Sequence, residues 1–125
     1  MATMQLSFSL CVHASSRIDV RSLLAVQPSR EHYRQDDDVK VYFYDAAYGS
    51  KDFLESLLDF LKIVGKYTDA LKGTDVKVDL WCLVETTSGF TGLVIDSEAM
   101  RFMSERAIDF FVSVYGNEAE TSGAG

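Results

Sequence analysis

The residues best suited to chemistry in this chain are two cysteines and two histidines, Cys11, His13, His32 and Cys82. Thiolates and imidazoles together suit zinc, and an imidazole beside a thiol can activate that thiol as a nucleophile. Cys11 and His13 share one face of a predicted strand, whereas Cys82 falls on the apolar face of another strand. This separation favours two free thiols. We therefore predict no metal, no cofactor and no enzymatic activity, and keep a cysteine-dependent enzyme as a remote alternative.

A run of three carboxylates, Asp36, Asp37 and Asp38, could in principle bind a cation through oxygen ligands. It lacks the glycine and the spaced glutamate of a calcium loop, so a solvated charge run is the favoured interpretation. The eight glycines are scattered singly, and no phosphate loop or dinucleotide-binding motif occurs. Nucleotide-dependent catalysis has no support in this sequence.

The charge balance restricts the partners. The net charge of the 125 residues is -7 and the pI is about 4.7, which disfavours nucleic acid and anionic membrane surfaces. An acidic surface would instead steer a basic protein partner toward it. With no signal peptide, no apolar run long enough to span a bilayer and two free thiols, we expect a cytoplasmic protein.

Five segments have the alternating pattern of strands, namely residues 5–13, 39–44, 76–85, 93–95 and 108–115. The fourth is expected to follow a hairpin connection over residues 86–92. Three segments are predicted as helices, namely residues 17–25, 53–64 and 96–106. Ser15 and Ser16 offer a cap for the first helix, and Gly65 is expected to break the second before another turn over 67–72.

These elements predict an α+β fold in which three helices pack on one face of a mostly antiparallel five-stranded sheet. The length allows one domain, which we place at residues 1–116, and the tail 117–125 is expected to be disordered because it has no large apolar residue. In the core, the long helix should pack against the first strand.

Several local patterns resemble a bacterial family catalogued as domain of unknown function 4279. The resemblance is carried by the opening Phe8-Ser9-Leu10, the segment Leu23-Leu24-Ala25-Val26-Gln27-Pro28-Ser29, the leucine-rich long helix, and the closing Ile108-Asp109-Phe110-Phe111-Val112-Ser113-Val114-Tyr115. None of these motifs is catalytic. The resemblance implies the fold, and it implies an immunity protein encoded beside a bacterial toxin as one role.

The sheet face turned away from the helices carries the strongest functional signal. Strand parity places five aromatic residues there, namely Tyr42, Tyr44, Trp81, Phe111 and Tyr115. Large aromatics on a face without helices indicate an interface, with Asp36, Asp37 and Asp38 steering a basic partner. The alternative is that they pair across strands as a minor second core under the connection 27–38.

We therefore expect a non-enzymatic protein-binding module, and one form of it is an immunity protein that neutralises a cognate toxin by occlusion. A homodimer of structural or regulatory role, formed by pairing of the aromatic face with itself, is the alternative from a different class.

Overall fold

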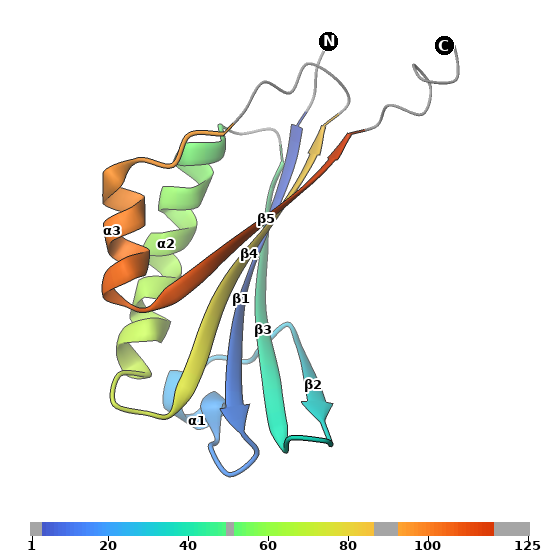
Figure 1. Cartoon of the computed structure of the whole chain (residues 1–125), viewed down its shortest axis with the longest axis vertical. Helices are drawn as coiled ribbons and strands as arrows, with labels where there is room; N and C mark the ends of the chain where they lie inside the picture. Colours follow the sequence, from blue (N-terminus) through green and yellow to red (C-terminus); the bar gives the residue numbers. More distant parts are fainter. Residues whose placement is uncertain (1–3, 50–51, 87–92, 117–125) are drawn as a thin grey trace.

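The computed structural model describes residues 4–49, 52–86 and 93–116, and within these ranges the chain forms one five-stranded sheet and three helices (Figure 1). The strands are β1 (Met4–Ser15), β2 (Arg30–Arg34), β3 (Val39–Gly49), β4 (Val76–Thr86) and β5 (Ile108–Gly116). The helices are α1 (Val20–Leu24), α2 (Phe53–Ala70) and α3 (Ser97–Glu105). All three helices lie on the same side of the sheet. The predicted α+β class and layering are confirmed.

The strand order is β2-β3-β1-β4-β5, and every neighbouring pair is antiparallel except β4 and β5. The parallel pair follows from α3, which carries the chain back across the sheet so that β5 starts at the same end as β4. The long β1 is therefore central and is paired on both sides. The strands β2 and β5 are the two edges of the sheet.

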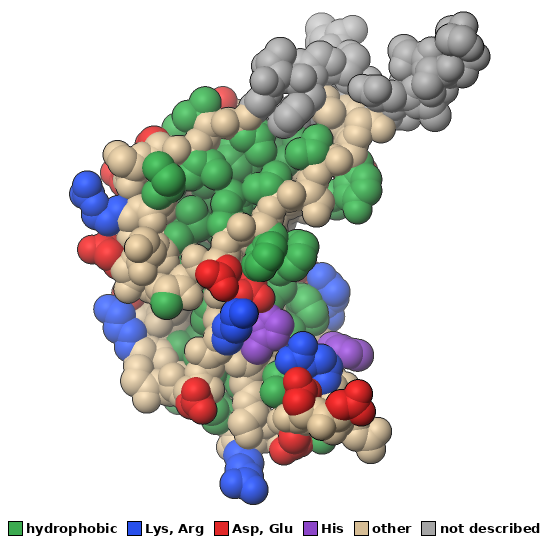
Figure 2. Space-filling view, in the orientation of Figure 1, with side chains coloured by type: hydrophobic (Ala, Val, Ile, Leu, Met, Phe, Trp, Pro, Cys, Tyr) green, Lys and Arg blue, Asp and Glu red, His purple; other side chains and the backbone are tan. Residues whose placement is uncertain are grey.

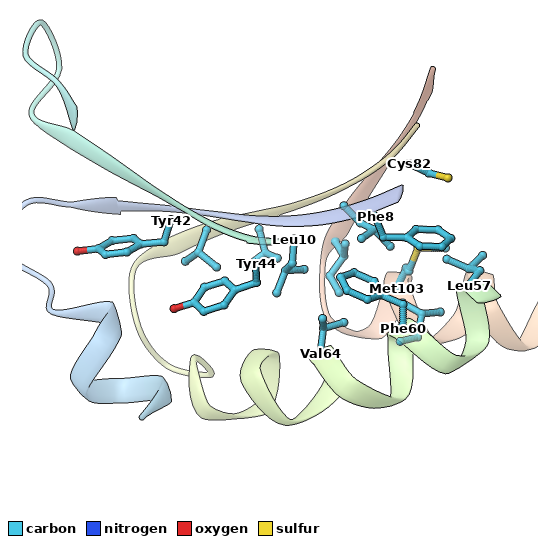
Figure 3. Close-up of a cluster of buried hydrophobic side chains, with 14 of the residues drawn as sticks. Phe8, Leu10, Tyr42, Tyr44, Leu57, Phe60, Val64, Cys82 and Met103 are labelled. Atoms are coloured by element: carbon cyan, nitrogen blue, oxygen red, sulfur yellow. The ribbon is translucent and has the colours of Figure 1, made fainter. Parts of the chain in front are cut away.

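The core lies between the sheet and α2. Alternate residues of β1, such as Phe8 and Leu10, face the helices and are almost fully buried, together with Leu57 and Val64 of α2. The rings of Phe8 and Phe60 stack with centroids 5.3 Å apart (Figure 3). The predicted packing of the long helix on the first strand is confirmed. No helix within the described ranges is long and apolar enough to cross a membrane.

The fourth predicted strand, residues 93–95, is wrong. Leu93 and Ile95 are unpaired and lie partly buried against the core on the way into α3. The fifth strand of the sheet is instead β2, which falls within the connection predicted for residues 27–38. The sequence does not predict β2 as a strand because its residues are mostly polar. An edge strand can be polar because it pairs with one neighbour only, here β3. Residues 87–92 of the predicted hairpin, and the predicted disordered tail 117–125, lie outside the described residues.

The helix boundaries differ from expectation at two points. The cap of α1 is Asp19, whose carboxylate accepts from the amide of Ser22, while Ser15 ends β1. Gly65 does not break α2, which continues to Ala70. A Cβ atom at Gly65 would lie 2.8 Å from Cζ of Phe102, so this glycine allows α3 to approach α2 closely.

Candidate functional site

The sheet face turned away from the helices, called the outer face from here on, is hollowed along its middle. In the middle of β1 this face presents three small side chains, Ser7, Ser9 and Cys11. The flanking strands present larger ones, among them Phe43 on β3 and Trp81 on β4. Small residues on the central strand between large residues on its neighbours produce a trough of about 580 Å³, which we call the aromatic groove.

One wall of the aromatic groove is the ring of Trp81, which is supported by a stacked neighbour on the edge strand β5. Trp81 lies beside Phe111 in the parallel register of β4 and β5, with centroids 4.4 Å apart and an interplanar angle of 12°. Trp81 and Phe111 are 42% and 39% exposed, so the pair presents a large apolar surface to solvent. The stack immobilises both rings before any partner arrives, which lowers the entropy cost of using them as binding anchors.

The opposite wall combines an aromatic ring with a cation. The guanidinium carbon of Arg30 lies 4.0 Å from the ring centroid of Phe43, and the Arg30 Nε donates to the Asp45 carboxylate at 3.1 Å. The amide of Asp45 in turn donates to the hydroxyl of Ser29. This chain of contacts holds the guanidinium over the ring at the rim of the groove.

Cys11, on the groove floor, is not placed as a nucleophile. Its sulfur has hydrogen-bond contacts with the hydroxyl and the carbonyl oxygen of Ser9. Burial raises the pKa of the Cys11 thiol, and the nearby Asp79 carboxylate raises it further, although the Ser9 hydrogen bond lowers it in part. The nearest histidine on the same strand, His13, is held instead by Asp79, with 2.9 Å between Nε2 and Oδ2. The thiol form is therefore favoured at neutral pH.

Cys82 lies on the inner side of the sheet, where burial raises its pKa to about 12. The prediction of two unbridged cysteines on opposite faces is confirmed. Among the described residues, no group of three or more histidine, cysteine, aspartate or glutamate side chains is arranged to hold a metal ion.

A second, polar hollow of about 680 Å³ lies at the β2–β3 turn end of the outer face. It includes His13 and Asp79 with two of the predicted carboxylates, Asp37 and Asp38. Asp37 pairs with Arg34 at 3.2 Å, and Asp38 accepts from the hydroxyl of Tyr33 at 2.6 Å, which lowers its pKa. The salt bridge with Arg34 reduces the long-range steering effect of Asp37, whereas Asp38 keeps its full negative charge because tyrosine is a neutral donor.

The predicted placement of Tyr42 and Tyr44 on the outer face is wrong. Both rings face the helices and are 3% and 6% exposed (Figure 3). Tyr44 contacts the Tyr67 ring at 5.3 Å between centroids, and burial raises the pKa of its hydroxyl to about 12. The length of Tyr44 lets it contact Tyr67 near the end of α2 and donate from its hydroxyl to the carbonyl oxygen of Val26, just after α1.

The parity of β3 therefore brings Phe43 to the groove in place of its two tyrosine neighbours. The sequence does contain a clue to this orientation. Asp45 lies two residues after Phe43 and so on the same side of β3, and a charged residue is expected on the side that faces solvent. Trp81, Phe111 and Tyr115 do lie on the outer face as predicted. Phe43, Arg30 and Asp45 are the groove residues that the sequence reasoning missed.

Comparisons with protein-family models, with curated proteins and with solved structures find no match. The resemblance to the family of unknown function stays a prediction.

Proposed function

We propose that this protein is a non-enzymatic binding module and that a protein partner docks in the aromatic groove. The observation that carries the proposal is the groove itself, a largely apolar hollow of about 580 Å³ between two preorganised aromatic walls. It lies on the face of the sheet that the helices leave uncovered. Exposed apolar surface of this kind, bordered by polar groups, is typical of interaction sites.

The groove dimensions favour a row of partner side chains. The side chains of the two walls belong to β3 and β4, the strands on either side of β1. The backbones of β3 and β4 are therefore two strand spacings apart, about 9.6 Å. Between two aromatic walls this leaves room for one layer of side chains. The hydroxyls of Ser7 and Ser9 on the floor could accept or donate hydrogen bonds to polar groups of the partner.

The charge balance favours a basic partner, because the chain has a net charge of -7. A finer form of the proposal is an immunity protein of the bacterial cytoplasm that occludes a cognate toxin, and it rests on this charge and on the family resemblance. The groove alone also fits self-association through the outer face. A cysteine-dependent enzyme has less support, because the pKa of Cys11 is raised and His13 is engaged by Asp79.

The test is capture of partners from native lysate, followed by affinity measurement with the purified partner. Trp81→Ala should raise the dissociation constant by about 30-fold or more, as expected for loss of an anchor worth about 2 kcal/mol. Ile63→Ala is the matched control, since Ile63 is 48% exposed but lies on α2. If both variants bind with the affinity of the parent, the groove is not the docking site.

The carboxylate run supplies a second readout of the same interface. Replacing Asp36, Asp37 and Asp38 by asparagine should slow association slightly and flatten its salt dependence, leaving dissociation unchanged. The effect should be modest, because the charge of Asp37 is already partly balanced by Arg34. A change in dissociation rate would instead place these residues inside the contact.

A further inference from the structure

The two edges of the sheet are protected very differently. The edge strand β2 is five residues long, and four of these are arginine, glutamate or histidine, Arg30, Glu31, His32 and Arg34. Short, charged edges resist pairing with other chains. The opposite edge strand, β5, is nine residues long and carries one charged side chain, Asp109. Among the described residues β5 pairs only with β4, so its other side presents free backbone donors and acceptors.

Apolar side chains are exposed on both faces of β5. Phe111 and Tyr115 are 39% and 62% exposed on the outer face, and Val112 and Val114 are 37% and 44% exposed on the helix side. Figure 2, which has the same orientation as Figure 1, shows apolar side chains gathered along β5 and between β5 and α3. This surface has exposed apolar side chains on both faces of the edge strand, and it meets the aromatic groove at Phe111, which stacks on Trp81.

The helix beside this edge extends the apolar surface. Phe102 of α3 faces α2, because its ring meets Gly65. Helical spacing then places Met100, which is 53% exposed, on the opposite flank of α3, away from α2. The described part of the chain thus exposes apolar side chains on both faces of the sheet beside the free edge of β5.

We propose that a second copy of this chain pairs with β5 in antiparallel orientation, so that two sheets join into one through a two-fold axis at Ser113. About this axis Phe111 faces Tyr115 on the outer side, and Val112 faces Val114 on the helix side. Aromatic pairs and pairs of β-branched residues are favourable across antiparallel strands. The strand is therefore complementary to itself.

The charge distribution is compatible with a second copy despite the net charge of -7. The only charged side chain of β5, Asp109, falls outside the pairs around Ser113 and lies 3.8 Å from Lys77. The carboxylate run Asp36–Asp38 lies in the turn between β2 and β3, at the opposite edge of the sheet. Pairing through β5 thus keeps the most acidic segment of each copy away from the interface.

The test measures the mass of the full chain by sedimentation equilibrium from micromolar to millimolar concentration. A dimer is expected, and Val114→Lys should raise its dissociation constant by about tenfold or more, because each copy then sets a lysine opposite Val112. Ile63→Lys, on an equally exposed position of α2, is the control and should leave the mass unchanged. The double variant Val112→Glu/Val114→Lys should recover dimerisation, because it sets opposite charges across both halves of the interface.

A covalent readout tests the two-fold axis independently of the stability of these variants. Ser113→Cys should give a disulfide-linked dimer on mild oxidation, since the axis places the two sulfur atoms opposite each other. Tyr33→Cys on β2 should not. The proposal is overturned if the native chain stays monomeric throughout, if Val114→Lys leaves the dimer unchanged, or if Phe43→Ala, in the groove and away from β5, alone dissociates it. The last result would assign self-association to the aromatic groove.

Discussion

The two faces of the central sheet are built from alternate residues of the same strands, yet they differ in what covers them. On the inner face Leu10 and Tyr44 lie beneath the helices and are almost fully buried. On the outer face Phe43 and Trp81 border an open groove. Burial on the inner face contributes to folding, whereas apolar surface left open on the outer face contributes only when a partner covers it. Truncations on the two faces should therefore have separable effects.

The sharpest test of this comparison uses two adjacent residues of β3. Tyr44→Ala should lower the free energy of unfolding by about 3 to 5 kcal/mol, as for other large aromatic residues removed from a core. Phe43→Ala should cost less, about 1 to 2 kcal/mol, since the Phe43 side chain is only partly buried and part of the loss is its contact with Arg30. Urea unfolding monitored by circular dichroism measures both. Equal losses of unfolding free energy in the two variants would show that inner-face and outer-face residues of β3 contribute equally to stability.

A second test extends the comparison to the helix layer. Leu57 is fully buried against the sheet, whereas Ile63 on the same helix is 48% exposed. Leu57→Ala should cost about 2 to 5 kcal/mol of unfolding free energy, and Ile63→Ala less than about 1 kcal/mol. Chemical denaturation of the two variants at one pH gives both values. A loss below about 0.5 kcal/mol for Leu57→Ala would mean that the inner face of α2 is assigned wrongly.

The sequence predicts best where the two sides of an element differ in polarity. In β1, Leu6 and Phe8 alternate with serines, and at the start of β4 Val78 lies between two charged residues, so both strands are predicted correctly. The same holds for the apolar stripe of α2. In these elements burial follows directly from the side-chain pattern.

The errors occur where the local pattern is ambiguous. Over residues 39–44 both sides of β3 carry large apolar or aromatic side chains, so alternation cannot say which side is inner, and Tyr42 and Tyr44 were placed on the wrong face. The charged β2 is a strand only because β3 offers it a partner, a tertiary effect that its own sequence does not encode. A break at Gly65 is predicted because glycine disfavours helix, but the helix continues, and what Gly65 allows is the close approach of Phe102, 37 positions away in the sequence.

The third comparison concerns the two thiols, one on each face, and near pH 8 its effect is the smallest. Burial raises the pKa of Cys82 from 9.0 to about 12, so the unfolded chain loses this proton at a pH where the folded chain keeps it. The free energy of unfolding is therefore unaffected by ionisation of this thiol below pH 9. It falls as the pH rises from 9 toward 12, by about 1.4 kcal/mol per pH unit at most. Cys82→Ala removes this dependence.

Near pH 8, Cys82→Ala should unfold more easily than the parent by about 1 kcal/mol, because it leaves a small cavity. The difference should close between about pH 9 and pH 10 and then reverse, since only the parent has a thiol to ionise on unfolding. Cys11→Ala is the matched control. Burial also raises the pKa of Cys11, but the Ser9 hydrogen bond opposes that rise, so its difference from the parent should change less with pH. Urea titrations at several alkaline pH values decide the matter, and a constant difference for Cys82→Ala would place that thiol in contact with water.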